Sequence, residues 1–501
     1  MKNLNFFLII QILLMYMGIQ AQSPSIEWQK CIGGSDDDYA TSIIQTSDGG
    51  YITVGNAKSS DFDFEGNPYL SSIWVVKLSN DGEIEWKKLL GGGFMSKIIQ
   101  NTKGNYIISA TTLTYAWIAE IDNMGNLIWQ KSYGGSNLND LNSIIQTPEG
   151  GYLFVGQTAS MDGDLENINI PPYKMGWIVK IDSIGTIEWQ KMVGGTIYEK
   201  LNNVTLTSDN GYIIAGMATS NGGDVQGNNW FECAWILKLN SNTIIEWQKC
   251  IGSDTYNQAK DIKQCSDGGY IVACDKNHDY ADNRDGFIVK LSATGTIEWQ
   301  TEVGGNSDDF LTSIIETSDG GIIVGGTTES WSGDVPLPSY GFQDCWIVKL
   351  SNSGNIQWQR RFGGNDFDYL RSIEQTNDNG FIFAGGAKSR SNDVIGLHST
   401  GLYTFYTDMW IVKLSPNVYA KQFNVEDNIN IYPNPATNIL NIEVNANLLN
   451  EPLNICTIHG QIVYSEIIDS ELFQIKVNQL SKGVYFIKIE TSQQIHKFIV
   501  N

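Results

Sequence analysis

The first feature that could do chemistry is a short acidic run with the spacing of a calcium-binding loop. Asp61, Asp63 and Glu65 place carboxylates at alternate positions, and Gly66 follows at the sixth. Alternating oxygen ligands and a sharp glycine turn suit Ca²⁺, but the twelfth position holds Ser72 rather than a bidentate glutamate. The run therefore predicts either a calcium site with Asp61, Asp63 and Glu65 as ligands, or a solvated acidic loop.

Aspartates and aromatic residues also recur at matching places in the long, variable segments of the chain. Recurring aspartates either serve a shared ligand or cap their own turns through backbone N–H groups. Since variable loops carry most binding sites, we expect these segments to form a ligand-binding face. The candidate binding residues are Tyr69, Asp164, Asp224, Trp230, Trp331, Asp334, Tyr340 and Asp393.

No residue is predicted to be catalytic. The sequence has four histidines, which form no cluster, and it contains no G-x-S-x-G motif. Carboxylate pairs are numerous, and two carboxylates suffice for glycoside hydrolysis. We therefore expect a non-catalytic binding or adhesion protein whose ligand is a glycan or another protein. The alternative is a secreted carbohydrate-active enzyme, or another hydrolase or lyase, that acts through the acidic loops.

The seven cysteines show no C-x-x-C or zinc-ligand spacing, and their odd number leaves at least one unpaired within the chain. Cys31 and Cys250 occupy the same place in two repeats, where other repeats have apolar or small residues. We predict that these cysteines are buried small apolar side chains.

A repeat that runs from residue 26 to 415 must position all these groups. Its units contain I-E-W-Q-K, then S-I-I-Q-T-S-D-G-G-Y-I-I-V-G-G, then W-I-V-K-L or close variants. The tryptophans of the first motif lie 43 to 60 residues apart, a period typical of solenoids, propellers and arrays. These tryptophans are Trp28, Trp86, Trp129, Trp189, Trp247, Trp299 and Trp358.

Each unit predicts four short strands rich in β-branched and aromatic residues. The second strand is apolar on both faces, as expected for strands covered by neighbouring sheets. Radially packed four-stranded sheets meet that condition, so the sequence predicts an all-β, seven-bladed β-propeller. In the sixth unit the strands are expected at 313–317, 322–326, 346–350 and 356–360.

The first and last motifs predict how the ring closes. The W-I-V-K-L strand at 410–414 has no I-E-W-Q-K after it, and the extra copy stands at 26–30. We expect these two strands to pair antiparallel, with Glu27 opposite Lys413. A lysine and a glutamate eight residues apart, as in Lys77 and Glu85, should face each other across the last hairpin of a unit.

Charge and the N-terminus limit the partners. The net charge of −23 argues against nucleic acid, because phosphate binding needs a basic surface.

Lys2 precedes an apolar stretch from Phe6 to Ile19, which predicts a signal peptide ending at Ala21. No other candidate span follows, so we expect no transmembrane segment after signal removal.

The repeat stops after residue 415, and the last part of the chain has a different style. Residues 429–501 contain Y-P-N-P at 432–435, I-H-G-Q-I-V at 458–463 and L-S-K-G-V-Y-F at 480–486. Alternating strands and glycine turns predict a small β-sandwich. In this order the motifs resemble the type A sorting domain of the type IX secretion system of Bacteroidota. The resemblance implies periplasmic entry by the signal peptide, then translocation by the type IX secretion machinery through residues 429–501 and removal of the domain.

The expected organisation is therefore a signal peptide at 1–21, a propeller at 22–415, a linker at 416–428 and a sorting domain at 429–501. The propeller part also resembles uncharacterised propeller-type repeat regions of secreted Bacteroidota proteins, a resemblance that implies no activity. We expect a secreted protein, or one on the outer cell surface of a Gram-negative, Bacteroidota-like bacterium.

Overall fold

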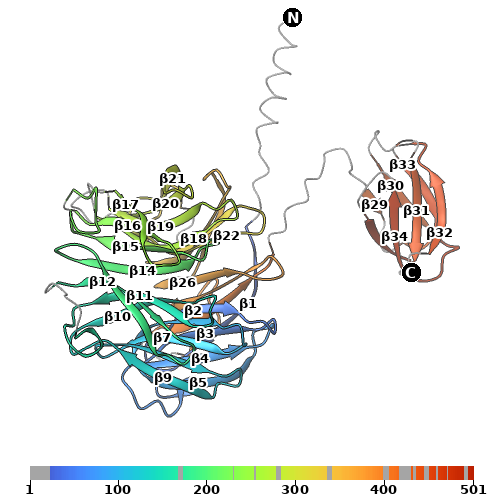
Figure 1. The fold of residues 1–501 in the computed structure, drawn as a ribbon. Helices are drawn as coiled ribbons and strands as arrows, with labels where there is room; N and C mark the ends of the chain where they lie inside the picture. The colour runs from blue at the N-terminus through green and yellow to red at the C-terminus, as the bar shows by residue number, and fades with distance from the viewer. Residues whose placement is uncertain are drawn as a thin grey trace, which may run out of the picture. The chain divides into compact units, whose positions relative to one another are not determined.

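The computed structural model describes residues 23–501 except 167–172, 230, 253–255, 278–283, 336–340, 399–405, 417–429, 433–435, 445–448, 450, 458–460, 471, 490–494 and 501. The expected signal peptide and nearly all of the expected linker lie outside the described residues. The chain divides into two compact units, one of residues 20–417 and one that contains residues 418–501 (Figure 1).

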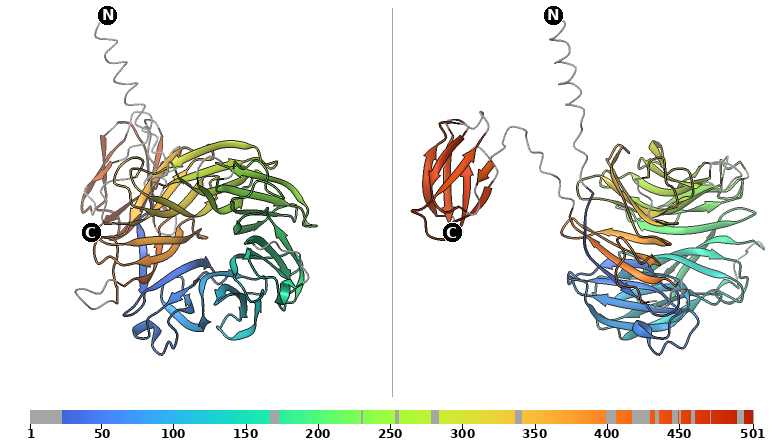
Figure 2. Two further views of the ribbon diagram at one scale, coloured as in Figure 1. Left: turned by 90° about the vertical axis from the view of Figure 1, so that its left-hand side faces the viewer. Right: turned by 180° about the vertical axis from the view of Figure 1, so that it is seen from behind.

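Seven four-stranded antiparallel sheets build the first unit, one for each copy of the repeat, so the predicted β-propeller is confirmed. Figure 2 shows the sheets following one another around a ring in chain order. We number the blades from 1 to 7 in that order, beginning with the sheet that contains β2. Blades 1 to 3 consist of β2 (Asp38–Gln45), β3 (Tyr51–Ala57), β4 (Ser72–Leu78) and β5 (Ile84–Gly92); β6 (Phe94–Gln100), β7 (Tyr106–Thr112), β8 (Tyr115–Ile121) and β9 (Leu127–Tyr133); and β10 (Asn139–Gln146), β11 (Tyr152–Thr158), β12 (Met175–Ile181) and β13 (Ile187–Val193).

The remaining blades repeat the same order of strands from the centre outwards. Two short 3-10 helices, Phe62–Phe64 and Gly163–Leu165, lie in the loops of blades 1 and 3. Blades 4 to 6 consist of β14 (Glu199–Leu206), β15 (Tyr212–Ala218), β16 (Cys233–Leu239) and β17 (Ile245–Ile251); β18 (Asn257–Gln264), β19 (Tyr270–Asn277), β20 (Arg284–Leu291) and β21 (Ile297–Val303); and β22 (Asp309–Glu316), β23 (Ile322–Thr328), β24 (Asp344–Leu350) and β25 (Ile356–Phe362). Blade 7 consists of β26 (Asp368–Gln375), β27 (Phe381–Ala387), β28 (Asp408–Leu414) and β1 (Ile26–Ile32).

The N-terminal strand supplies the outer strand of blade 7, as the repeat predicts. β1 pairs antiparallel with β28, but Trp28 lies opposite Lys413, where Glu27 was expected, because Glu27 is the extra residue of a β-bulge. Blades 1 and 7 also share one hydrophobic cluster, in which Ile43 of blade 1 packs with Ile382 of blade 7. Burying the edge of β28 in this way removes an open template for pairing with other chains.

The predicted lysine–glutamate pairs are present, but their register differs from the expectation. Lys77 lies directly opposite Trp86, and Glu85 is the extra residue of a β-bulge. Lys77 Nζ still lies 3.2 Å from Glu85 Oε2, and 3.1 Å from Asp48 Oδ2 of the S-D-G-G turn. Both acidic groups therefore stabilise a lysine whose side chain is only 2% exposed.

Side chains at the ends of six innermost strands, five glutamines and one glutamate, join neighbouring blades. The Ser47 N–H of blade 1 donates to Gln100 Oε1 of blade 2 at 2.9 Å, and the Asn377 N–H of blade 7 donates to Gln45 Oε1 of blade 1 at 2.8 Å. Equivalent bonds use Gln146, Gln264, Glu316 and Gln375 as acceptors. We call these bonds the interblade latches.

The second unit is the predicted small β-sandwich. One sheet has the order β29-β30-β33 and the other the order β32-β31-β34-β35. Leu440 and Ile442 of the first sheet pack with Ile455 and Ile487 of the second in a single core. Among the described residues, no helix is long and apolar enough to cross a membrane. The strands are β29 (Asn430–Tyr432), β30 (Ile439–Glu443), β31 (Pro452–Thr457), β32 (Ile462–Ile467), β33 (Leu472–Lys476), β34 (Gly483–Ile489) and β35 (Ile495–Val500).

Candidate functional site

The long loops of the blades gather on one face of the propeller. In blade 1 and in blades 3 to 7, the loop between the second and third strands is hydrogen-bonded to the loop that leads into the innermost strand, as in the bond of 3.1 Å from Lys58 N to Asp37 O. Equivalent bonds start at Ala159, Thr219, Asn277, Glu329 and Lys388. We call this surface the long-loop face.

The recurring aspartates of this face each hold their own blade together. Asp164 N–H donates to Gly134 O at 3.1 Å, and Asp164 Oδ2 accepts from Gly134 N–H at 2.9 Å. Asp224 makes the same two bonds to Gly194, and Asp393 makes them to Gly363. This is the turn-capping role, and the structure leaves these aspartates in separate blades. Asp334 binds Gly304 through its backbone N–H in the same way.

The residues of the calcium-like run are engaged by other groups. Asp61 Oδ1 accepts from the Ser35 N–H at 2.9 Å, and Asp63 Oδ1 lies 2.8 Å from Lys87 Nζ. Asp63 Oδ2 lies 3.4 Å from His398 Nε2. Glu65 is exposed. Across the described ranges, no three His, Cys, Asp or Glu side chains are grouped so that they could hold a metal ion, and calcium at this run stays a prediction of the sequence.

Aromatic side chains are exposed on the same face. Tyr69 is 48% exposed and Trp331 is 59% exposed. Phe342 and Phe367 stack at 5.3 Å between ring centroids with an angle of 10° between the ring planes, and Phe342 is 67% exposed. The repeat gave no signal for this pair, because neither phenylalanine recurs in it. Trp230 and Tyr340 lie outside the described residues.

A hollow on the long-loop face lies between blades 5 and 6. It has a volume of about 390 Å³, and Asp285, Glu302 and Asp334 are among the residues that line it. A β-carbon on Gly304 would lie 2.3 Å from Asp285 Oδ1 and 2.8 Å from Asp309 Oδ2, so two carboxylates flank this glycine. Burial, together with Asp285, raises the pKa of Asp309 to about 6.

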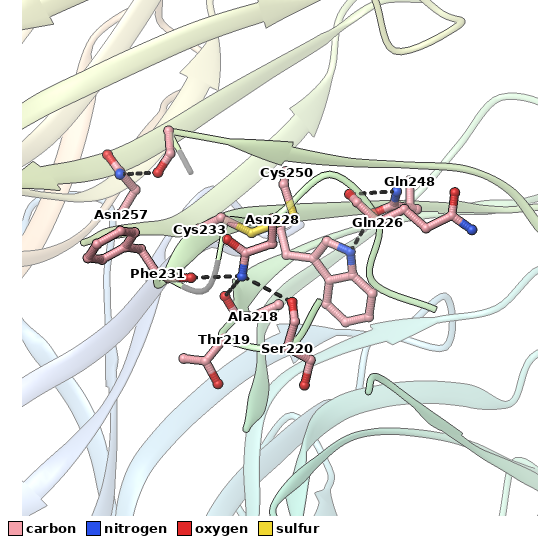
Figure 3. Close-up of a disulfide and its surroundings, with 12 residues drawn as sticks. Ala218, Thr219, Ser220, Gln226, Asn228, Phe231, Cys233, Gln248, Cys250 and Asn257 are labelled. Atoms are coloured by element: carbon pink, nitrogen blue, oxygen red, sulfur yellow. Dashed lines mark hydrogen bonds between the residues drawn. A yellow bond between two sulfur atoms is a disulfide. The ribbon is translucent and has the colours of Figure 1, made fainter. Parts of the chain in front are cut away.

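The third and fourth strands of blade 4 are joined by a disulfide near the same face. Cys233 and Cys250 are 17 residues apart, with 5.5 Å between their Cα atoms (Figure 3). The prediction that Cys250 is a small apolar side chain is therefore wrong. The repeat hid the pairing, because the positions of Cys233 and Cys250 hold Asp344 and Arg361 in blade 6.

The loop next to this disulfide is also fixed by an amide. Asn228 Nδ2 donates to the carbonyl oxygens of Ala218, Ser220 and Phe231 at 2.7 to 3.2 Å (Figure 3). Asn67 of blade 1 binds the carbonyls of Ala57 and Ser59 in the same manner. The ends of these loops are thus held in place by local hydrogen bonds.

A second concave region is the central channel of the propeller, with a volume of about 1080 Å³. It is lined by the innermost strands of all seven blades. Each of these strands contains a bulge, such as that between Ala40 and Ser42, and both Thr41 and Ser42 line the channel. The channel had no role among the expectations from sequence. The sequence did contain a feature that could have indicated the channel: charged residues stand at positions where most blades have serine, threonine, asparagine or isoleucine.

Comparisons with known proteins bear on both units. Residues 430–501 match the family described as the Secretion system C-terminal sorting domain. The regulatory protein FlaEY of Caulobacter vibrioides is 24% identical over 204 residues, which are 36% of this chain and 21% of that protein. The chain thus spans about a fifth of the length of this curated relative.

Solved structures with similar chain traces include several propellers. The Dos1 propeller has a TM-score of 0.42 at 10% identity, over 78% of this chain and 95% of that one. The WD40 domain of Neurospora crassa Pan2 has a TM-score of 0.41 at 8% identity, over 77% and 98%. The extracellular domain of a hybrid two-component system from B. thetaiotaomicron has a TM-score of 0.41 at 10% identity, over 96% and 58%.

The fold and the family match together define a class of protein. The chain is a β-propeller protein that carries a type IX sorting domain at its C-terminus. Such a tail implies a secreted or cell-surface protein.

Proposed function

We propose that this is a non-catalytic binding or adhesion protein that takes a glycan or protein ligand on the long-loop face. The observation that carries the proposal is the exposure of Trp331 and of the stacked pair Phe342 and Phe367 on the loops of blades 6 and 7. Large exposed apolar groups on a soluble domain commonly mark interaction sites, and aromatic rings supply large contact area with few rotatable bonds. Tyr69, Trp230 and Tyr340 extend this proposed surface.

The supporting frame is pre-organised. The hydrogen bonds between Asp164 and Gly134 and the Cys233–Cys250 disulfide fix the ends of the loops. Ligand binding would therefore cost little conformational entropy of the backbone. The proposal includes a signal peptide at 1–21, a linker at 416–428, and delivery to the outer surface of a Bacteroidota-like bacterium.

The full chain should be tested on a glycan array and in pull-downs with surface proteins. Ligand binding should weaken by about tenfold or more in Trp331→Ala and in Phe342→Ala, which each remove one exposed aromatic anchor. Ile244→Ala is the matched control, because Ile244 is 61% exposed at a turn on the opposite face. Equal binding by all variants would contradict the proposal.

The hollow between blades 5 and 6 supports a second candidate, a hydrolase. Asp285 and Glu302 both belong to its lining, and a pair of carboxylates is what most glycoside hydrolases use as acid and base. A panel of polysaccharides and chromogenic glycosides should then be cleaved by the full chain and not by Asp285→Asn or Glu302→Gln. Absence of hydrolysis across the panel would remove this candidate.

A further inference from the structure

We infer that the central channel is a second binding site, separate from the proposed long-loop site, for a small carboxylated and hydroxyl-rich ligand such as a uronic acid. The inference rests on the residues that line the channel, and it stands or falls independently of the long-loop proposal.

The first observation is where the blades depart from their own repeat. In blade 1 the channel positions hold Thr41, Ser42 and Ile44, and the other blades mostly keep similar residues. Three blades instead place charged side chains there, from β6, β18 and β26. Since the remaining blades fold with neutral residues at these positions, packing does not require the charges. The charged residues are Lys97, Lys260, Asp261, Lys263, Arg371 and Glu374.

The second observation is that these charges influence one another across the channel. Burial lowers the pKa of Lys97 to about 8, with a further contribution from Lys263 on the opposite wall. Burial also raises the pKa of Glu374 to about 7, although Lys263 and Lys97 act against that rise. Groups from blades 2, 5 and 7 therefore share one electrostatic environment.

The third observation is that part of the positive charge is left without a carboxylate partner. Lys260 Nζ lies 3.0 Å from Asp275, and Lys263 Nζ lies 2.8 Å from Asp261. Lys97 Nζ instead donates to the Ser143 hydroxyl at 3.1 Å. No carboxylate in the described part of the chain forms an ion pair with Lys97.

The balance of charge selects the ligand. The channel is lined by four cationic and two acidic side chains, in a protein whose net charge is −23. An isolated cation in a confined space is costly, and an anion would relieve that cost. A monoanion fits better than a dianionic phosphate, because Asp261 and Glu374 would repel a second negative charge.

The neutral lining fits the rest of such a molecule. Asn142 and Asn202 each use one amide N–H to bind a carbonyl of the next blade, and the second N–H of each amide can bind a sugar hydroxyl. Tyr39 and Tyr369 also line the channel, with their ring centroids 6.4 Å apart. Both lie near the starts of innermost strands, so they border the end of the channel that opens toward the long-loop face. The volume of about 1080 Å³ lies just above the usual range for small-ligand pockets, so the ligand would share the channel with water.

The test is titration calorimetry of the full chain with galacturonate, with glucose as the neutral sugar and inorganic phosphate as the non-sugar anion. Galacturonate should bind, and its affinity should fall by about tenfold in Lys97→Ser. This variant restores the residue of the other blades and should keep the fold, which the melting temperature checks. Lys88→Ser, on the exposed side of β5, is the matched control and should bind as the parent does.

A variant that is expected to increase the affinity distinguishes ligand binding from a merely structural effect. Glu374→Gln removes a repelling charge and should tighten galacturonate binding. The parent should bind more tightly at pH 6 than at pH 8, because Glu374 loses its negative charge and Lys97 becomes more fully protonated. Equal binding of glucose, binding of phosphate alone, or no binding at all would overturn the inference. Loss of galacturonate binding in Trp331→Ala would place the ligand on the long-loop face instead, and would also overturn it.

Discussion

At the scale of single residues, carboxylates at the start of the innermost strands are buried within the propeller. Asp38 accepts hydrogen bonds from the N–H groups of Gly34, Lys58 and Ser59 and from the Ser59 hydroxyl at 2.6 to 3.1 Å, and it is fully buried. Burial raises its pKa to about 7, with the nearby Asp408 contributing. Blade 3 has the neutral Asn139 at the same position, which shows that the fold does not need the charge.

These aspartates predict a propeller that loses stability as the pH rises toward neutrality. Burial raises the folded-state pKa of Asp38 to about 7 and those of Asp309 and Asp368 to about 6, from 3.8. The folded state then binds more protons than the unfolded state between about pH 4 and 7, so the free energy of unfolding falls across that window. The melting temperature should be several degrees higher at pH 5 than at pH 8.

The matched variant replaces all three aspartates by asparagine. It should keep the hydrogen-bond acceptor at each position and flatten the dependence of the melting temperature on pH between 5 and 8. A slope that persists in the triple variant would assign the pH dependence to other groups.

A buried ion pair in blade 6 gives a second residue-scale prediction. Arg361 Nε lies 3.0 Å from Asp344 Oδ2, and both side chains are almost completely buried. Arg361→Ala should lower the free energy of unfolding by about 3 kcal/mol, because it leaves a buried carboxylate without its partner. Urea unfolding should show that the double variant Asp344→Ala, Arg361→Ala costs less than Arg361→Ala alone. Lys103→Ala, an exposed site, is the control.

At the scale of strands and blades, the sequence was sufficient for most of the fold. The three repeat motifs predicted the strands and their number, and the unmatched copies of W-I-V-K-L and I-E-W-Q-K predicted the pairing of β1 with β28. The β-bulges were not predicted, because one extra residue such as Glu85 leaves the apolar pattern intact while changing which residue lies opposite Lys77. The charged lining of the channel was missed for a related reason: the bulge turns consecutive residues toward the same side.

The interblade latches give a prediction about how blades adhere. The junction between blades 3 and 4 lacks both partners of this bond. Leu206 stands where the other blades have the accepting glutamine or glutamate, and Pro148, which has no N–H, stands where they have the donor. Leu206→Gln alone should not stabilise the protein, because the Oε1 of the new glutamine would face Pro148, which has no N–H to donate. With Pro148→Ser it should add about 1 kcal/mol to the free energy of unfolding. A double-mutant cycle by urea unfolding measures the coupling, and additive effects would contradict the latch.

At the scale of the whole molecule, the ring depends on its first strand. Deleting residues 22–31 should expose the edge of β28 and remove Glu27, whose Oε2 lies 3.2 Å from Lys413 Nζ. Unpaired edges recruit other chains, so the shortened protein should form aggregates whose size grows with concentration in light scattering. A monomeric shortened protein with an unchanged melting temperature would contradict this role of β1.

The last prediction concerns export, which belongs to the chain as a whole. The sandwich has its own hydrophobic core, and residues 430–501 match a secretion sorting domain. Removing residues 429–501 should therefore leave a folded propeller in the periplasm, detected by fractionation and by protease resistance. A matched fusion protein that joins residues 416–501 to a periplasmic reporter should carry the reporter to the cell surface or medium. If the truncated chain still reached the surface, the sorting domain would not direct export. If the reporter stayed in the periplasm, the propeller would have to contribute to the signal.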